Sequence, residues 1–200
     1  MNVTKKTYNL QSLNFLKDTK LKIGVLGGSF NPAHHGHLLI SKQAIDIYKC
    51  DYVIWLVANQ NPLKPKYQYT TLKRAEQAAK IVTHPKVIVS SAEHDFDSQY
   101  LYDSLKKLIM YFSGNDFVWL MGVDNLANFH KWHKSEEISE LCKIILFDRP
   151  VGERFVNNSQ FSLKFKPILA KTQTDNIIIH KGLMYPISSS QIKHSLLERD

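Results

Sequence analysis

Short apolar runs alternate with amphipathic stretches along most of the chain. Runs such as 52–58 and 143–147 contain almost no polar residue, which is typical of strands that are covered by helices on both faces. The predicted strands are 21–26, 52–58, 86–90, 117–121, 143–147 and 176–180. Apolar residues at helical spacing predict helices over 36–49, 71–82, 100–112, 135–142 and 189–198, with a further helix after Asn125.

The alternation of strands and helices predicts an α/β fold with a doubly wound parallel sheet. We expect a single domain over residues 20–200, preceded by an N-terminal extension over 1–19 with one helical turn near Leu13 to Leu16. An acidic loop is expected over 93–97, and residues 150–175 carry no readable pattern. In sheets of this kind, ligands bind beyond the carboxyl ends of the strands.

Composition adds a charge bias to this picture. The 200 residues are 44% hydrophobic and 22% charged, as in an ordinary globular domain. A net charge of +8 and a pI near 9.3 favour anionic partners, which are nucleic acid, acidic membranes or phosphorylated small molecules. Basic residues are dispersed and never form a run of five, so a nucleic-acid-binding tail is not indicated.

The cysteines and the N-terminus indicate the compartment. Cys50 and Cys142 have no metal-ligand spacing and are expected to be buried free thiols in a reducing environment. The N-terminus has no apolar signal core, and no stretch approaches the roughly eighteen apolar residues that a membrane span needs. We therefore expect a cytoplasmic protein without a membrane partner.

The most informative segment is 28–37, which reads GSFNPAHHGH directly after a predicted strand. His34, Gly36 and His37 form an H-x-G-H element at the start of a helix, where unpaired N–H groups and the helix dipole attract anions. The two histidines lie three residues apart and add donors to the same place. The segment therefore predicts a phosphate-binding turn for a nucleotide, with His35 at the surface.

A second anion-binding element is predicted near the C-terminus. Ser188, Ser189 and Ser190 start the last predicted helix, and Lys193 lies one turn further on. The hydroxyls can cap the helix or donate to phosphate oxygens, and the pattern alone leaves both roles open.

Taken together, these elements resemble the nucleotidylyltransferase superfamily. Residues 187–193 are similar to its I-S-S-T-x-I-R motif, with Ser190 and Lys193 as departures. A lysine keeps the charge of the arginine but lacks its bidentate fork. The segment 121–132 is similar to the M-G-A-D-N-L-x-x-F-x-x-W stretch of nicotinate-nucleotide adenylyltransferases. Further similarities to that family lie at 59–64, at 147–150 and at 99–105, where Leu101 replaces a threonine.

The resemblance implies a Rossmann-like nucleotidylyltransferase fold and a reaction of NAD biosynthesis. ATP would donate its adenylyl group to nicotinate mononucleotide, giving nicotinate adenine dinucleotide and pyrophosphate by in-line attack without a covalent intermediate. Mg²⁺ would be bound through the ATP phosphates, and no nucleic acid would take part. The residues implied to be catalytic are His34, His37 and Lys193.

The same resemblance implies two sets of binding residues. Those for ATP are Gly27, Gly28, Ser29, Phe30, His34, Gly36, His37, Gly122, Asp124, Ile187, Ser188, Ser189 and Lys193. Those for the nicotinate substrate are Asn59, Lys64, Tyr100, Leu101, Asn125, Trp132 and Arg149. No protein metal site is predicted, because Asp124, His130 and His133 lack zinc-ligand spacing.

Several roles stay open at this level. Asp124 can cap a helix or accept hydrogen bonds from a ribose. Trp132 can belong to the core or stack on a pyridinium ring. Lys64 can be a solvated charge or bind a phosphate.

The function also has rivals. One is adenylyl transfer to nicotinamide mononucleotide or to phosphopantetheine. Nicotinate and nicotinamide differ in one carboxylate, which backbone N–H groups can recognise. Another rival, suggested by the net charge of +8, is a nucleic-acid-binding module that keeps a nucleotide-binding fold. The sequence leaves homo-oligomerisation undecided.

Overall fold

The computed structural model describes residues 7–60, 66–122, 125, 128–147 and 176–180 of the chain. The described strands are β1 (Thr7–Tyr8), β2 (Lys22–Gly28), β3 (Tyr52–Val57), β4 (Val87–Ser90), β5 (Asp116–Gly122), β6 (Lys143–Phe147) and β7 (Ile177–His180). The described helices are η1 (Gln11–Leu16), α1 (His35–Asp46), α2 (Thr71–Ile81), α3 (Ala92–Asp95), α4 (Leu101–Tyr111) and α6 (Ser135–Leu141).

The strands form one seven-stranded sheet in the order β1-β4-β3-β2-β5-β6-β7, and every neighbouring pair is parallel. From β2 the chain winds outward through β3 and β4, and from β5 it winds the other way through β6 and β7. The direction therefore reverses between β2 and β5. This confirms the doubly wound α/β sheet, and the reversal is where such sheets bind ligands.

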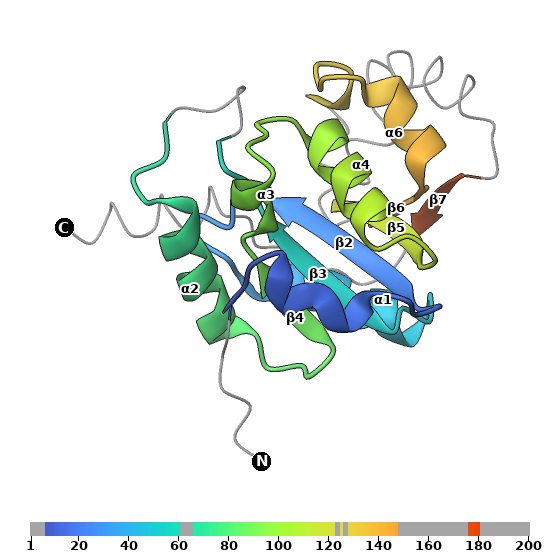
Figure 1. The fold of residues 1–200 in the computed structure, drawn as a ribbon, viewed down its shortest axis with the longest axis horizontal. Coiled ribbons are helices and arrows are strands. Elements are labelled where there is room, and N and C mark those ends of the chain that lie inside the picture. Colours follow the sequence, from blue (N-terminus) through green and yellow to red (C-terminus); the bar gives the residue numbers. More distant parts are fainter. Residues whose placement is uncertain (1–6, 61–65, 123–124, 126–127, 148–175, 181–200) are drawn as a thin grey trace.

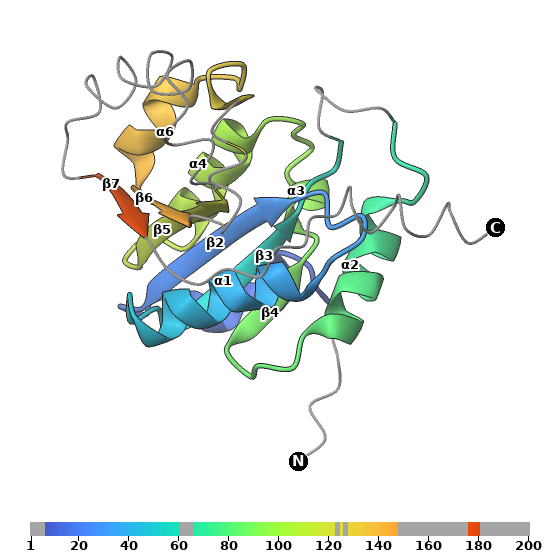
Figure 2. The same cartoon turned by 180° about the vertical axis from the view of Figure 1, so that it is seen from behind.

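Helices cover both faces of the sheet, as the apolar strand sequences predicted. Figure 1 shows η1 and α4 in front of the sheet, and the view from behind in Figure 2 shows α1. One core lies under η1, α4 and α6 and contains Trp119, while the other lies under α1 and α2 and contains Trp55. Both indoles are 1% exposed or less.

The N-terminal segment belongs to this core as far as it is described. β1 pairs with β4 at the edge of the sheet, and η1 supplies the helical turn expected near Leu13 to Leu16. Both of these leucines are fully buried. Residues 7–16 therefore pack against the domain and do not extend away from it.

The predicted strands and helices within the described residues agree with the structure to within three residues at their ends, the largest difference being helix 36–49, which ends at Asp46. The Thr70 hydroxyl caps α2 by accepting from the Lys73 N–H, 3.2 Å away. The acidic loop expected over 93–97 was wrong in part, because the short helix α3 occupies its start. Ala92 and Phe96 are both buried there and hold the segment against the core. The predicted helix 189–198 and residues 150–175 lie outside the described residues.

Both cysteines are free thiols, as expected, with Cys50 buried and Cys142 half-buried. Burial raises the pKa of Cys50 to about 11 and that of Cys142 to about 12, so both remain protonated near neutral pH. None of the described helices has the length and apolar character needed to cross a bilayer.

Candidate active site

The site begins where β2 ends, beside the reversal of the sheet. At Gly27, an added Cβ would lie 2.1 Å from Cη2 of Trp119, a residue of the neighbouring strand β5. Only glycine lets the indole lie against this strand. Gly28 and Ser29 follow, and the chain turns through Phe30, which has a φ of 44°, toward α1.

The two histidines of the H-x-G-H element form a capping box at the start of α1. Nδ1 of His34 accepts from the Gly36 N–H at 3.1 Å, and Nδ1 of His37 accepts from the His34 N–H at 3.1 Å. Because both Nδ1 atoms accept, the neutral rings carry their protons on Nε2. The ring centroids are 3.9 Å apart, so this end of α1 holds two neighbouring N–H donors. His35 is exposed, as predicted.

Aromatic packing fixes the His37 ring. Its centroid lies 4.8 Å from that of Phe30 and 5.6 Å from that of Trp55. Phe30 stacks on Trp55 at 5.1 Å and 13°. The Trp55 indole N–H donates to the Ser41 hydroxyl, which in turn donates to the His37 carbonyl. A buried scaffold therefore holds the imidazole and limits its rotation.

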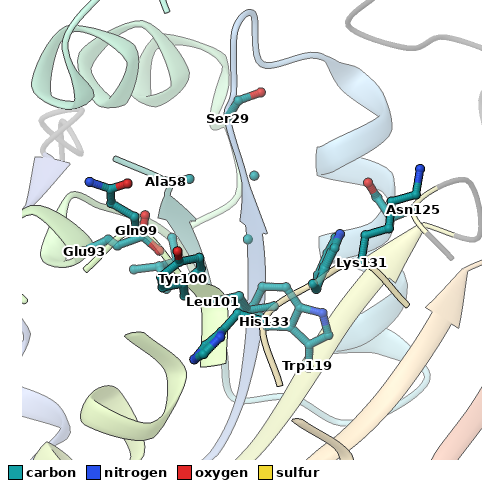
Figure 3. A pocket seen from close by; sticks show the side chains of 14 residues that line it. Ser29, Ala58, Glu93, Gln99, Tyr100, Leu101, Trp119, Asn125, Lys131 and His133 are labelled. Atoms are coloured by element: carbon teal, nitrogen blue, oxygen red, sulfur yellow. The ribbon is translucent and has the colours of Figure 1, made fainter. Parts of the chain in front are cut away.

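A cavity of about 360 Å³ lies next to the glycine turn, on the side of the sheet that α4 covers. It brings together seven residues that the sequence predicted for the site: Gly27, Gly28, Ser29, Tyr100, Leu101, Asn125 and Trp132. Figure 3 shows Tyr100 and Leu101 on one side of β2, the strand that leads to Ser29, and Asn125 on the other. Phe30, His34, Gly36 and His37 lie at the start of α1 and do not line this cavity.

Aromatic rings form much of one wall. The Tyr100 ring is 43% exposed and lies 4.5 Å from the His133 ring at 35°. Trp132 is half-buried, packs 5.4 Å from Phe129 and also lines the cavity. Trp132 therefore packs on the core and also faces the cavity, and its stacking on a ligand stays a prediction.

The sequence reasoning missed several cavity residues. Glu93, Gln99, Trp119, Lys131 and His133 all line it. Glu93 could have been predicted, because it follows the carboxyl end of β4 within three residues, and ligands bind beyond the carboxyl ends of strands in sheets of this kind. Lys131 and His133 flank the predicted Trp132, and they place basic groups beside the aromatic wall.

Glu93 is a buried acid in this cavity, with 4% of its surface exposed. Burial raises the pKa of Glu93 to about 7, although the Asn59 N–H donates to its carboxylate and the Arg74 charge lies nearby, both of which lower it. Near neutral pH this carboxyl is therefore a mixture of its neutral and charged forms.

The remaining predicted residues fall into two groups. Asn59 does not line the cavity, and its side-chain amide bonds to the Glu93 and Ser98 carbonyls and to the Thr71 hydroxyl. Gly122 ends β5. The others lie outside the described residues, and their roles stay predictions: Lys64, Asp124, Arg149, Ile187, Ser188, Ser189 and Lys193. Among the described residues, no three His, Cys, Asp or Glu side chains come together as metal ligands.

Comparisons with known proteins identify relatives of this chain. The family model described as cytidylyltransferase-like matches residues 25–195. A protein of Roseobacter denitrificans named "Probable nicotinate-nucleotide adenylyltransferase" is 41% identical over 132 residues, which are 66% of this chain and 66% of the relative. A protein of the same name from Methylorubrum extorquens strain PA1 is 40% identical over 131 residues, which are 65% of this chain and 71% of the relative.

Solved structures show the same fold. The nicotinic acid mononucleotide adenylyltransferase of Plasmodium falciparum, complexed with NaAD, superposes with a TM-score of 0.65 at 19% identity, covering 88% of this chain and 83% of that one. The same enzyme complexed with APC gives a TM-score of 0.63 at 17% identity, covering 87% and 83%.

Proposed function

This chain belongs to the nicotinate-nucleotide adenylyltransferases of the cytidylyltransferase-like family, and we propose that it carries out the reaction for which they are named. An oxygen of the nicotinate mononucleotide phosphate attacks the α-phosphorus of ATP. The bond to the bridging oxygen breaks, pyrophosphate leaves, and nicotinate adenine dinucleotide forms. No bond to the protein is made at any stage.

The attacking group needs no general base. The second pKa of a phosphate monoester is about 6, so the nucleophile is already an anion near pH 7. The barrier comes from bringing two anions together and from the charge that grows on the leaving pyrophosphate. Positioning and electrostatic stabilisation must therefore supply most of the catalysis.

The start of α1 suits the phosphates of ATP. His34 and His37 offer Nε2–H donors because their Nδ1 atoms are occupied by backbone N–H groups. The helix dipole adds positive potential at the same place. We assign His37 to the oxygens on which charge develops, and Ser188, Ser189 and Lys193 to the β and γ phosphates. Mg²⁺ would enter with ATP and neutralise part of the phosphate charge.

The cavity suits the nicotinate ring. A pyridinium ring is flat and positively charged, and it is attracted to the faces of Tyr100 and Trp132. Its carboxylate is negative, and Lys131 and His133 bring basic groups to the same wall. This combination favours nicotinate over nicotinamide mononucleotide. Because both cysteines are free thiols, we place the reaction in the reducing cytoplasm.

One observation carries the proposal: the turn that leads to the paired histidines at the start of α1 also lines, through Gly27, Gly28 and Ser29, a cavity with an aromatic wall. The test is to incubate the pure protein with ATP, Mg²⁺ and either nicotinate or nicotinamide mononucleotide, and to measure pyrophosphate. We expect release with the nicotinate form only. Release with both would mean that the ring pocket discriminates poorly, with Leu101 the first residue to examine. Release with neither would overturn the enzymatic assignment.

A further inference from the structure

A chain of hydrogen bonds connects the turn after β2 with Glu93, which lines the cavity. It runs through the side chains of Arg74, Thr71 and Asn59 to Glu93, whose carboxylate accepts from the backbone N–H of Asn59, and we call these four residues the positioning chain. Arg74, Thr71 and Glu93 are each 8% exposed or less, and Asn59 is half-buried. None of the four belongs to the phosphate turn or to the aromatic wall. Arg74 bonds to the turn at Ser29, and Asn59 bonds to Ser98, whose hydroxyl accepts from the Tyr100 N–H.

One end of the positioning chain holds the phosphate turn. The guanidinium of Arg74 is fully buried, and its Nη1 donates to the Ser29 carbonyl at 2.6 Å. Its Nη2 donates to the carbonyls of Ala58 at 2.5 Å and Asn59 at 2.8 Å. A single rigid fork therefore fixes the turn after β2 relative to the end of β3.

The middle of the positioning chain transmits this constraint. The Thr71 hydroxyl accepts from Nη2 of Arg74 at 3.2 Å and donates to Oδ1 of Asn59 at 3.0 Å. Nδ2 of Asn59 donates to the carbonyls of Glu93 at 2.9 Å and Ser98 at 3.1 Å. The amide of Asn59 is thus bonded at both its oxygen and its nitrogen.

The other end is bonded to the segment that leads to Tyr100. The Asn59 N–H donates to the Glu93 carboxylate, and the charge of Arg74 lowers the pKa of that carboxyl. The Ser98 hydroxyl accepts from the Tyr100 N–H at 3.2 Å. Tyr100 in turn packs against His133. A displacement of Arg74 would therefore shift Tyr100 through the hydrogen bonds of the positioning chain and Ser98.

We propose that the positioning chain sets the spacing between the phosphate turn at Ser29 and the ring wall at Tyr100. The proposal rests on the transfer reaction proposed above. Each half of the site can bind its own substrate without the chain, but in-line attack requires the two halves to stand at one separation. A misplacement of about 1 Å can cost on the order of 10² in rate. Thr71 and Arg74 are positioning residues, since neither contacts the reacting atoms.

The test compares two variants that differ in the linking hydroxyl. Thr71→Val keeps the shape of the side chain and removes the hydroxyl, whereas Thr71→Ser keeps the hydroxyl and removes the methyl. Turnover is measured per folded molecule, and the binding of ATP alone and of nicotinate mononucleotide alone is measured by calorimetry. Lys73→Met, an exposed change on the same helix, is the control.

We expect Thr71→Val to lower kcat roughly tenfold while both dissociation constants stay within about threefold of wild type. Thr71→Ser should keep kcat near wild type. A purely structural role would lower the melting temperature and leave kcat per folded molecule unchanged, and this result would overturn the proposal. Loss of binding of one substrate in proportion to kcat would also overturn it, because the residue would then be a binding group.

Two further outcomes remain decisive. If Thr71→Val does not fold, Arg74→Lys replaces it, because lysine keeps the charge but cannot bond the turn and β3 through one planar fork. The same split between kcat and binding is expected. If wild-type protein releases no pyrophosphate, the proposed function is wrong, and this inference, which rests on it, is wrong as well. If wild type is active and the variants match it, only the inference fails.

Discussion

The two sides of the site are held in different ways. On the phosphate side, His34 is 5% exposed, and the histidine pair is fixed by backbone hydrogen bonds and by the stacked rings of Phe30 and Trp55. On the ring side, Tyr100 is 43% exposed and His133 is also exposed, and these two pack against each other at the surface. One side is embedded in the core, and the other lies on loops at the edge of a helix.

The difference matches what each side is proposed to do. Stabilising charge on a phosphate needs donors that do not reorganise during the reaction, which a buried scaffold provides. Selecting a ring needs a surface that can be changed without loss of the fold, which loops provide. Changes on the phosphate side should therefore reduce turnover or stability, and changes on the ring side should act mainly on substrate affinity.

The largest effect is expected from His37→Ala. It removes an Nε2–H donor from the phosphates and should lower kcat by about 10² to 10³, the usual loss for one donor to a developing charge. Steady-state kinetics with a melting curve would separate this from unfolding. His35→Ala, which alters the exposed neighbour, should keep normal turnover. Normal turnover in His37→Ala would remove that residue from the mechanism.

The next effect concerns Glu93 and pH. Its pKa is raised to about 7 in the folded protein from an ordinary value of 4.5, so its contribution to stability is full below about pH 4.5 and is lost as the pH rises through 7. Glu93→Gln stays neutral throughout. The variant should match wild type near pH 4 and exceed it at pH 8 by at most about 3 kcal/mol.

Denaturant melts of both proteins across this pH range would measure the difference. Glu140→Gln, at an exposed acid, should show no such pH dependence. A constant gap between wild type and Glu93→Gln at all pH values would mean that the carboxyl titrates normally.

Gly27→Ala should lower the free energy of unfolding. The new Cβ would meet Trp119 at 2.1 Å, and the indole would have to shift. Overpacking of this kind costs about 1–3 kcal/mol of unfolding free energy. Gly28→Ala is the matched control, because its nearest contact would be Phe30 at 3.5 Å. Equal losses at both glycines would show that the indole yields easily. Adding Trp119→Phe to Gly27→Ala should restore part of the stability.

The smallest effect is expected on the ring side. Tyr100→Ala removes one aromatic face and should raise KM for nicotinate mononucleotide roughly three- to tenfold, since aromatic contacts are worth about 0.5–1.5 kcal/mol. The kcat should stay within a few-fold of wild type. Tyr100→Phe keeps the ring and should keep KM. A loss confined to kcat would mean that Tyr100 acts on turnover, as the residues of the phosphate side are expected to do, and not on substrate affinity.

The sequence could predict the features whose signal is local. Strands buried on both faces appear as apolar runs, and the H-x-G-H element lies within ten residues, so the sheet and the histidine pair could both be predicted. β1 was missed because two residues are too short to show a period. The start of α3 was missed because its sequence is mostly polar, which is typical of a loop, although Glu93 is buried.

The positioning chain shows most clearly why the rest could not be predicted. An arginine on an amphipathic helix is expected to face water, and Arg74 is fully buried only because carbonyls from Ser29, Ala58 and Asn59 meet it there. These partners lie 15 to 45 residues away in sequence. No pattern in one segment encodes a hydrogen bond that three segments must build together.

The position of Trp119 gives the protein an internal optical reporter. Of the three tryptophans, Trp119 and Trp132 line the cavity, while Trp55 lies in the other core. The Trp119 indole N–H has no hydrogen-bond partner among the described residues, in contrast to that of Trp55. A ring entering the cavity would come into contact with this indole and change its emission. Ligand titrations can therefore follow intrinsic fluorescence, and in Trp132→Phe a ligand-dependent change would come from Trp119, with Trp55 in the other core as a constant background.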